Sequence, residues 1–120
     1  MDIDILTKLY EKVIDRSVID SGCRLFTGAK KNGYGTVKKT IDGKVYSFYA
    51  HRIVKMYTLN DLDIDHCSHL CAKRNCIKED HISIECDAVN NQRKRCHEVR
   101  LCCRTHVALS GDALPNCIIK

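Results

Sequence analysis

The sequence predicts a small α+β domain whose chain is cross-linked through its cysteines. Its 120 residues are the length of one domain. Nine residues are cysteine, whereas aromatic residues make up only 6% and Trp is absent, so apolar packing alone is a weak source of stability. Helical and strand-like patterns alternate on both sides of the densest cysteine cluster, which favours the α+β class.

The cross-links are expected to be metal rather than disulfide. The first residues, "MDIDILTKLYEKVIDR", lack the basic start and continuous apolar run of a signal peptide. The cysteine count is odd, and Cys102 and Cys103 are adjacent. We therefore expect zinc-bound or free thiols in an intracellular, reducing compartment, with nucleus and cytoplasm undecided. No apolar run approaches the length of a membrane span, so we expect no membrane partner.

The first half of the chain predicts two helices and a hairpin. Apolar residues recur at helical spacing over 2–16. A short strand is expected at 23–28. Two β-prone runs over 33–52 flank Asp42–Gly43, a pair suited to a tight turn with positive φ, and so predict a hairpin. Residues 50–59 predict a short helix.

The second half predicts a strand, a helix and an irregular tail. We expect the strand at 82–87 and the helix at 87–96, with Asp87 as its cap. Residues 97–120 have no clear period. The interpretation is one domain over 1–120, made of an N-terminal helix (1–20), a hairpin and helix (22–59), a core (64–96) and a tail (96–120).

The stretch "DHCSHLCAKRNCIKEDH" at 65–81 holds three cysteines and three histidines. Cys71, Cys76 and His81 follow one another at four-residue gaps, and tetrahedral zinc takes four such sulfur or nitrogen ligands. Cys23, at the start of the predicted strand, is a plausible fourth. We therefore predict a first structural zinc site here. Zinc binding would add directly to the free energy of folding of a short chain with few aromatic residues.

A second set of ligands lies downstream. It consists of Cys96, one of Cys102 and Cys103, His106 and Cys117. His97 is an alternative ligand, and the choice between the two adjacent cysteines stays open. Cys67 and Cys86 fall outside both sets and are interpreted as small buried apolar residues.

If zinc takes the first set, His69 is left over. Alternation along a strand would put residues 67, 69 and 71 on one side and 66, 68 and 70 on the other. His69 would then lie beside the metal-anchored Cys71. Asn90 follows on the predicted helix, so a histidine on a strand would face an asparagine on a helix.

The residues "SHLCAKRNCIKEDHISIE" at 68–85 and "NNQRKRC" at 90–96 carry a family resemblance, supported by "GYG" at 33–35 and "AHR" at 50–52. The sequence resembles the zinc-braced His-Me finger (ββα-metal) nucleases, of the His-Cys box type known from intron homing endonucleases. The resemblance covers 22–117. It implies a ββα-metal motif with the first zinc in 64–96 and a second zinc in 96–120.

The resemblance also implies an HNH-type endonuclease that hydrolyses DNA phosphodiesters with one catalytic Mg²⁺. Asn90 would ligate the Mg²⁺ and His69 would be the general base, chemistry that suits an imidazole titrating near neutrality. Arg52 and Arg93 are candidates for stabilising charge in the transition state. His66 is the rival base, because Asp65-His66 resembles the "DH" of the wider HNH pattern.

Double-stranded DNA is the expected partner, and a net charge of +5 leans mildly toward a polyanion. The hairpin would enter a groove and contact phosphates. Its candidate lysines are Lys30, Lys31, Lys38, Lys39 and Lys44. Monomer and homodimer both stay open, and only three residues follow Cys117, which argues against a tail-swapped dimer. The alternatives are a non-catalytic, zinc-folded nucleic-acid-binding module and a protein-interaction domain.

Overall fold

The computed structural model describes residues 2–104 and 106–118, so the predicted domain limits at 1 and 120 lie outside the described residues. Helix α1 (Ile3–Asp15) begins where the Asp2 carboxylate accepts the backbone N–H of Ile5 at 2.9 Å. Its apolar face packs against helix α2 (Ala50–Leu59) and strand β4 (Tyr34–Ile41). The main core lies between these elements. The helix predictions for 2–16 and 50–59 are confirmed, the first to within one residue at each end.

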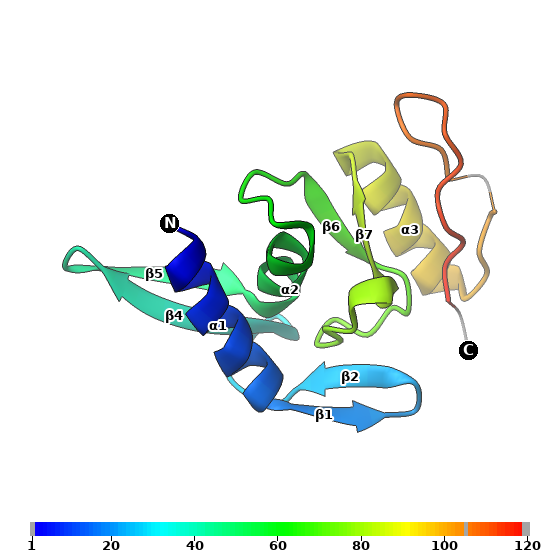
Figure 1. Ribbon diagram of the computed structural model, residues 1–120. Helices are drawn as coiled ribbons and strands as arrows, with labels where there is room; N and C mark the ends of the chain where they lie inside the picture. The colour runs from blue at the N-terminus through cyan, green and yellow to red at the C-terminus, as the bar shows by residue number, and fades with distance from the viewer. Residues whose placement is uncertain (1, 105, 119–120) are drawn as a thin grey trace.

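The predicted hairpin is also confirmed. β4 pairs with β5 (Lys44–Tyr49), and β3 (Lys30–Lys31) adds a short third strand on the other side of β4. Asp42 and Gly43 form the connection with φ of 50° and 80°, the left-handed pair that a two-residue hairpin turn needs. This hairpin extends away from the rest of the molecule (Figure 1).

A second hairpin was not predicted. β1 (Ser17–Asp20) pairs with β2 (Cys23–Phe26), and Ser21 and Gly22 turn between them with φ of 50° and 83°. β1 carries no apolar-polar alternation, since Val18 and Ile19 are both exposed. The "SG" turn signal at 21–22 was therefore the only local indication of this strand pair.

The ββα unit follows in chain order. β6 (His66–His69) pairs with β7 (Ile82–Glu85) across a loop that ends in the short 3₁₀ helix η1 (Glu79–His81), and helix α3 (Asp87–Val99) packs on β6 (Figure 1). Helix α3 begins where predicted and runs three residues further. The predicted Asp87 cap is wrong: Cys86 is the N-cap, without a side-chain cap bond.

The tail after α3 has little regular structure. Arg100, in the left-handed conformation, ends the helix, and an isolated bridge joins Val107 to Ala113. The tail then runs back beside α3 (Figure 1), and the Ile118 N–H donates to the Leu70 carbonyl at 2.7 Å. No helix in the described part of the chain has the length and apolar character to cross a bilayer.

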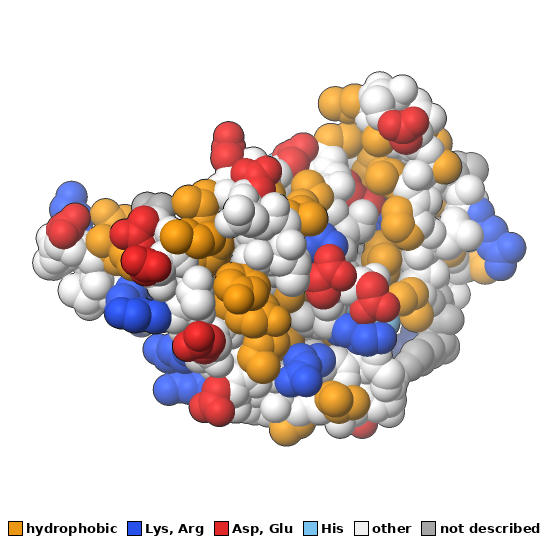
Figure 2. All heavy atoms as spheres, viewed as in Figure 1, with side chains coloured by type: hydrophobic (Ala, Val, Ile, Leu, Met, Phe, Trp, Pro, Cys, Tyr) orange, Lys and Arg blue, Asp and Glu red, His pale blue; other side chains and the backbone are white. Residues whose placement is uncertain are grey.

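The face of the molecule seen in Figure 2 interleaves acidic, basic and apolar side chains. Lysine and arginine side chains gather below the projecting hairpin, close to acidic side chains. A polyanion on this face would meet charges of both signs. The two faces of the hairpin sheet are therefore more informative about where a polyanion could bind.

Candidate functional site

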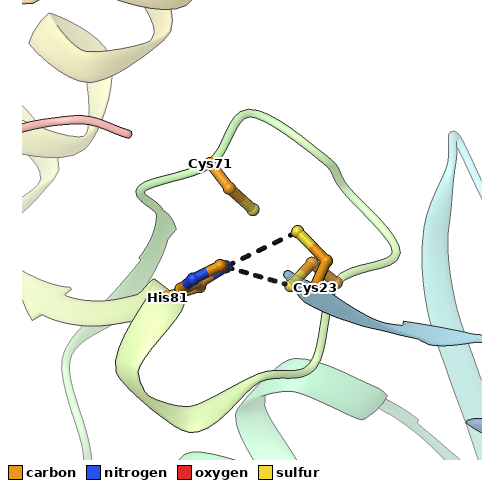
Figure 3. Close-up of side chains that lie close together, drawn as sticks. Cys23, Cys71 and His81 are labelled. Carbon is orange, nitrogen blue, oxygen red and sulfur yellow. Dashed lines mark hydrogen bonds between the residues drawn. The ribbon is translucent and has the colours of Figure 1, made fainter. Parts of the chain in front are cut away.

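The first Cys/His cluster joins three separate segments. Cys23 begins β2, Cys71 follows β6, Cys76 lies in the loop beyond it, and His81 ends η1. All four are buried, and their ligand atoms lie within 4.8 Å of one another. The Nδ1 atom of His81 lies 3.5 Å from the Cys23 sulfur and 3.7 Å from the Cys76 sulfur. Figure 3 shows Cys23, Cys71 and His81 converging on one point.

The thiols of this cluster compete for protons. A hydrogen bond from the Cys71 thiol lowers the pKa of Cys76 to about 4, and the same bond raises the pKa of Cys71. Burial raises the pKa of Cys23. One thiolate is therefore favoured over three, and a divalent cation that replaces the protons would let all three sulfurs ionise together.

The second cluster is built from α3 and the tail. Its ligands are Cys96, Cys102, His106 and Cys117, again within 4.8 Å of one another. The Nε2 atom of His106 lies 3.4 Å from the Cys117 sulfur and 3.7 Å from those of Cys96 and Cys102. The exposed Cys103 lies 3.9 Å from the same nitrogen but outside the set. His97, the alternative ligand, lies outside it too.

Both clusters offer three sulfurs and one imidazole nitrogen. This donor set is typical of closed structural zinc sites. In the second cluster, His106 is already oriented to bind metal through Nε2, because its Nδ1–H donates to the Gln92 side-chain oxygen at 2.8 Å. The two clusters fit two structural zinc ions.

A cavity of about 510 Å³ lies between the ββα unit and the base of the hairpin. His69 and Asn90 both line it, from β6 and α3. So do Tyr34, His51 and Arg52, together with Arg74 and Lys94. The structure thus places the predicted base and the predicted Mg²⁺ ligand on one cavity.

His69 is buried, and one of its ring nitrogens is already engaged. Its Nε2 lies 2.9 Å from the backbone carbonyl of Cys76, a ligand of the first cluster. A carbonyl only accepts, so Nε2 carries the proton and Nδ1 keeps its lone pair. Burial lowers the pKa of His69, which favours the neutral ring.

His51 is a cavity residue that the sequence did not single out. Its ring centroid lies 4.4 Å from that of His69, and Tyr34 packs against both imidazoles. Burial, with smaller contributions from His69 and Arg52, lowers the pKa of His51 to about 3. An uncharged imidazole therefore packs against the predicted base. "AHR" at 50–52 was the only signal of it.

The two glycines of "GYG", on either side of Tyr34, let neighbouring side chains approach the backbone closely. A Cβ at Gly35 would lie 2.5 Å from the Phe26 ring. Gly33 has φ of +85°, and a Cβ there would lie 3.2 Å from the side chain of Arg74. The Arg74 guanidinium lies 5.5 Å from the Tyr34 ring centroid and donates to the Asn32 carbonyl. This arginine joins the metal loop to the hairpin at the rim of the cavity.

The two predicted transition-state arginines are already paired. Arg52 donates to the carbonyls of Ile64 and Asp65 at 3.0 and 2.9 Å. Arg93 is fully buried, with a bidentate pair to Glu85 and a contact to the Cys117 sulfur. Arg93 lines the cavity wall between Asn90 and Lys94, but its buried guanidinium is already paired with Glu85, so its role beside a substrate phosphate stays a prediction.

His66, the rival base, is exposed at the edge of the cavity. The Asp65 carboxylate accepts the backbone N–H of His66 rather than bonding to its ring. The ring instead lies 4.0 Å from the Asp87 carboxylate. The Asp-oriented histidine of the HNH pattern is thus not formed at Asp65-His66.

The candidate lysines divide between the two faces of the hairpin sheet. Residues directly opposite in antiparallel strands share a face. Lys31 and Lys38 share the face of Tyr34, which lines the cavity, whereas Lys30, Lys39 and Lys44 share the face of the buried Val37. Only two of the five therefore extend the cavity face.

This combination of a ββα unit and two Cys/His clusters defines a zinc-braced domain of the His-Me finger type. The chain belongs to the family described as the zinc-binding loop region of homing endonuclease, whose model matches residues 23–120. The resemblance drawn from the sequence is thereby confirmed, and the protein is a nuclease-related zinc domain. No curated protein and no solved structure matches the chain.

Proposed function

We propose that the protein is an endonuclease that hydrolyses DNA phosphodiester bonds, with His69 as general base and one Mg²⁺ held by Asn90. The observation that carries the proposal is the contact between His69 Nε2 and the Cys76 carbonyl. It fixes the tautomer that leaves a free lone pair on Nδ1, in a cavity that Asn90 shares.

His69 would take a proton from the attacking water. Its lowered pKa keeps the ring unprotonated at neutral pH, as a base requires. Its Nε2–H bond to a carbonyl that belongs to the first metal loop fixes the plane of the ring. Burial against the neutral His51 limits other ring orientations.

Asn90 fits a hard cation through its side-chain oxygen. Mg²⁺ keeps most of its waters and needs few protein ligands besides substrate phosphate, so one amide oxygen on the cavity wall is a sufficient donor. A bound Mg²⁺ would stabilise the charge that develops on the phosphate and the leaving 3′-oxygen. The products would be 5′-phosphate and 3′-hydroxyl ends.

The positive charge near the substrate would come from cavity residues other than Arg93. Arg74 and Lys94 line the cavity, and Arg74 is exposed at its rim. Arg52 also lines it, but its bonds to the Ile64 and Asp65 carbonyls suit a role in holding the segment that leads into β6. Duplex DNA would lie along the hairpin face of Lys31 and Lys38. The cysteine ligands of both zinc sites have to stay reduced to bind metal, which suits a reducing compartment.

Plasmid nicking tests the catalytic part of this proposal. Wild-type protein should convert supercoiled DNA to nicked or linear forms with Mg²⁺ and not with EDTA. His69→Ala should lower the rate by about 10²- to 10⁴-fold with zinc content unchanged, as loss of a general base does. His66→Ala is the matched control and should cut within a few-fold of wild type. Equal cutting by His69→Ala and wild type would refute the assignment of the base.

Salt dependence tests the binding face. Each lost phosphate contact should reduce the slope of log K against log salt by about 1. The double variant Lys31→Ala/Lys38→Ala should therefore show a shallower slope by about 2. The pair Lys30→Ala/Lys44→Ala, with the same change of charge on the opposite face, should keep the wild-type slope. Equal slopes for the two double variants would contradict the assigned face.

A further inference from the structure

Helix α3 makes three different contacts with the second metal centre. Cys96 is one of its ligands. Gln92, one turn earlier, accepts the Nδ1–H of His106 at 2.8 Å. Arg93 donates from Nη1 to the Cys117 sulfur at 3.4 Å. Within two turns, the helix that carries Asn90 thus supplies one ligand, Cys96, and contacts two ligands from the tail, His106 and Cys117.

The same arginine attaches the helix to the sheet. The Nε and Nη2 atoms of Arg93 both donate to the Glu85 carboxylate, and Ser83 donates to the same carboxylate at 2.8 Å. Arg93 and Glu85 are almost completely buried, with side-chain exposures of 1% and 0%. A buried guanidinium needs every partner it has, because an unpaired charge in the interior is costly.

We propose that the second metal centre positions Asn90, and that Arg93 and Gln92 are the positioning residues that transmit its occupancy along α3. This inference rests on the proposed function, since it gives Asn90 the divalent cation. Asn90 lies one turn before Arg93 on α3, so a shift of the Arg93 guanidinium moves the backbone that places the Asn90 amide.

The metal supplies the fixed end of this connection. With zinc bound, the Cys117 sulfur is an anchored thiolate that accepts from Arg93, and His106 is held with its Nδ1–H toward Gln92. Without zinc, no metal fixes the Cys117 sulfur that accepts from Arg93 or the His106 ring that donates to Gln92. The guanidinium then loses one of its two anchors.

The test compares two arginines on the same helix. Arg93→Lys keeps the charge but loses the fork that reaches both Glu85 and Cys117. Arg95→Lys is the matched control, because Arg95 is exposed on α3. Mn²⁺ binding to each protein in complex with an uncleavable phosphorothioate duplex is measured by electron paramagnetic resonance, and zinc per chain is measured on the same samples.

Arg93→Lys should weaken Mn²⁺ binding by about 10-fold with two zincs retained, the low end of the loss in metal affinity seen when a supporting contact around a metal site is removed. Its nicking rate should recover to within a few-fold of wild type at saturating Mg²⁺. Arg95→Lys should match wild type in both. Wild-type Mn²⁺ affinity in Arg93→Lys would overturn the inference, whatever its rate.

Gln92→Ala serves if Arg93→Lys fails to fold or loses a zinc. It removes only the acceptor for His106, and the same weakening of Mn²⁺ binding is expected; an unchanged affinity would overturn the inference. A wild-type protein that neither binds Mn²⁺ nor nicks DNA would refute the proposed function and this inference with it. Normal wild-type behaviour with unchanged affinities in both variants would refute this inference alone.

Discussion

The two Cys/His centres use the same ligands, three cysteines and one histidine, but they are held differently. The first is enclosed by paired backbone. The Phe26 N–H donates to the Asn75 carbonyl at 2.8 Å and the Ile77 N–H to the Arg24 carbonyl at 2.7 Å, so the loop that carries Cys76 is attached along β2. All four ligands of this centre are buried.

The second centre gathers a segment that has little secondary structure of its own. Side chains rather than strands hold it, through Gln92 and Arg93, and Cys102 and Cys117 are only half-buried. The first centre therefore completes a folded core, whereas the second must organise the tail itself. Zinc should contribute to global folding at the first and to local order at the second.

Loss of a ligand at the first centre should have the largest effect. Cys76→Ser removes the most buried sulfur, which also anchors the loop whose carbonyl holds His69. Binding of a structural zinc contributes about as much free energy as the whole stability of a domain, so the variant should show no cooperative thermal transition. Circular dichroism during heating measures this. A sharp transition near the wild-type temperature would show that the two centres do not differ as described.

Loss of a ligand at the second centre should leave a folded protein. Cys117→Ser should reduce zinc from about two to about one per chain and keep a cooperative, lowered transition. Limited proteolysis should then cut selectively after residue 100, where the tail depends on the metal. Cleavage spread evenly over the chain, or complete unfolding, would place the second centre in the global core.

Acid should lower the free energy of unfolding partly through His51, a histidine that is not a zinc ligand. Burial lowers the pKa of His51 to about 3, against 6.5 in the unfolded chain. The neutral ring therefore contributes fully to the free energy of unfolding above pH 6.5, and this contribution falls as the pH drops toward 3. Between these values the unfolded chain binds the extra proton, which costs up to about 1.4 kcal/mol per pH unit.

Urea unfolding of zinc-saturated protein at pH 6.5, 6.0 and 5.5 measures this dependence. The free energy of unfolding should fall more steeply in wild type than in His51→Phe, which has no group to titrate at that position. Zinc loss in acid is common to both proteins, so their difference isolates His51. Parallel curves would show that the ring titrates normally in the folded protein.

The smallest effect is expected for Cys103→Ser, which changes the residue next to the zinc ligand Cys102. Cys102→Ser should lose the second zinc, whereas Cys103→Ser should retain both and cut DNA within about two-fold of wild type, as surface substitutions do. Metal analysis of the two purified variants decides the choice that the sequence left open. Loss of zinc from Cys103→Ser would move the ligand by one residue.

Local chemistry explains which parts of the fold were predictable. The turn at Asp42–Gly43, the helix at 50–59 and the spacing of Cys71, Cys76 and His81 follow from residues close together in the chain. The β1–β2 pair was missed because Val18 and Ile19 face solvent, so no alternation marked the strand.

The missed features of the site depend on residues far apart in sequence. Arg93 is helical and basic, and nothing near it indicates that Glu85 and Cys117 bury its charge. His51 lies in the first turn of α2, which packs against β4 and β5, and its contact with His69 of β6 joins residues 18 positions apart. The sequence pattern placed the lysines on a hairpin, but only the strand register assigns each lysine to one face of the sheet.

The central claim is that two independent zinc centres support one cleavage site, and stepwise zinc removal tests it most directly. Native mass spectrometry during titration with a chelator would follow the zinc-bound species while nicking is measured on the same samples. We predict that the second zinc leaves first and yields a folded one-zinc species with strongly reduced cleavage at low Mg²⁺. Simultaneous loss of both zincs, or a one-zinc species that cuts as well as the intact protein, would contradict this account.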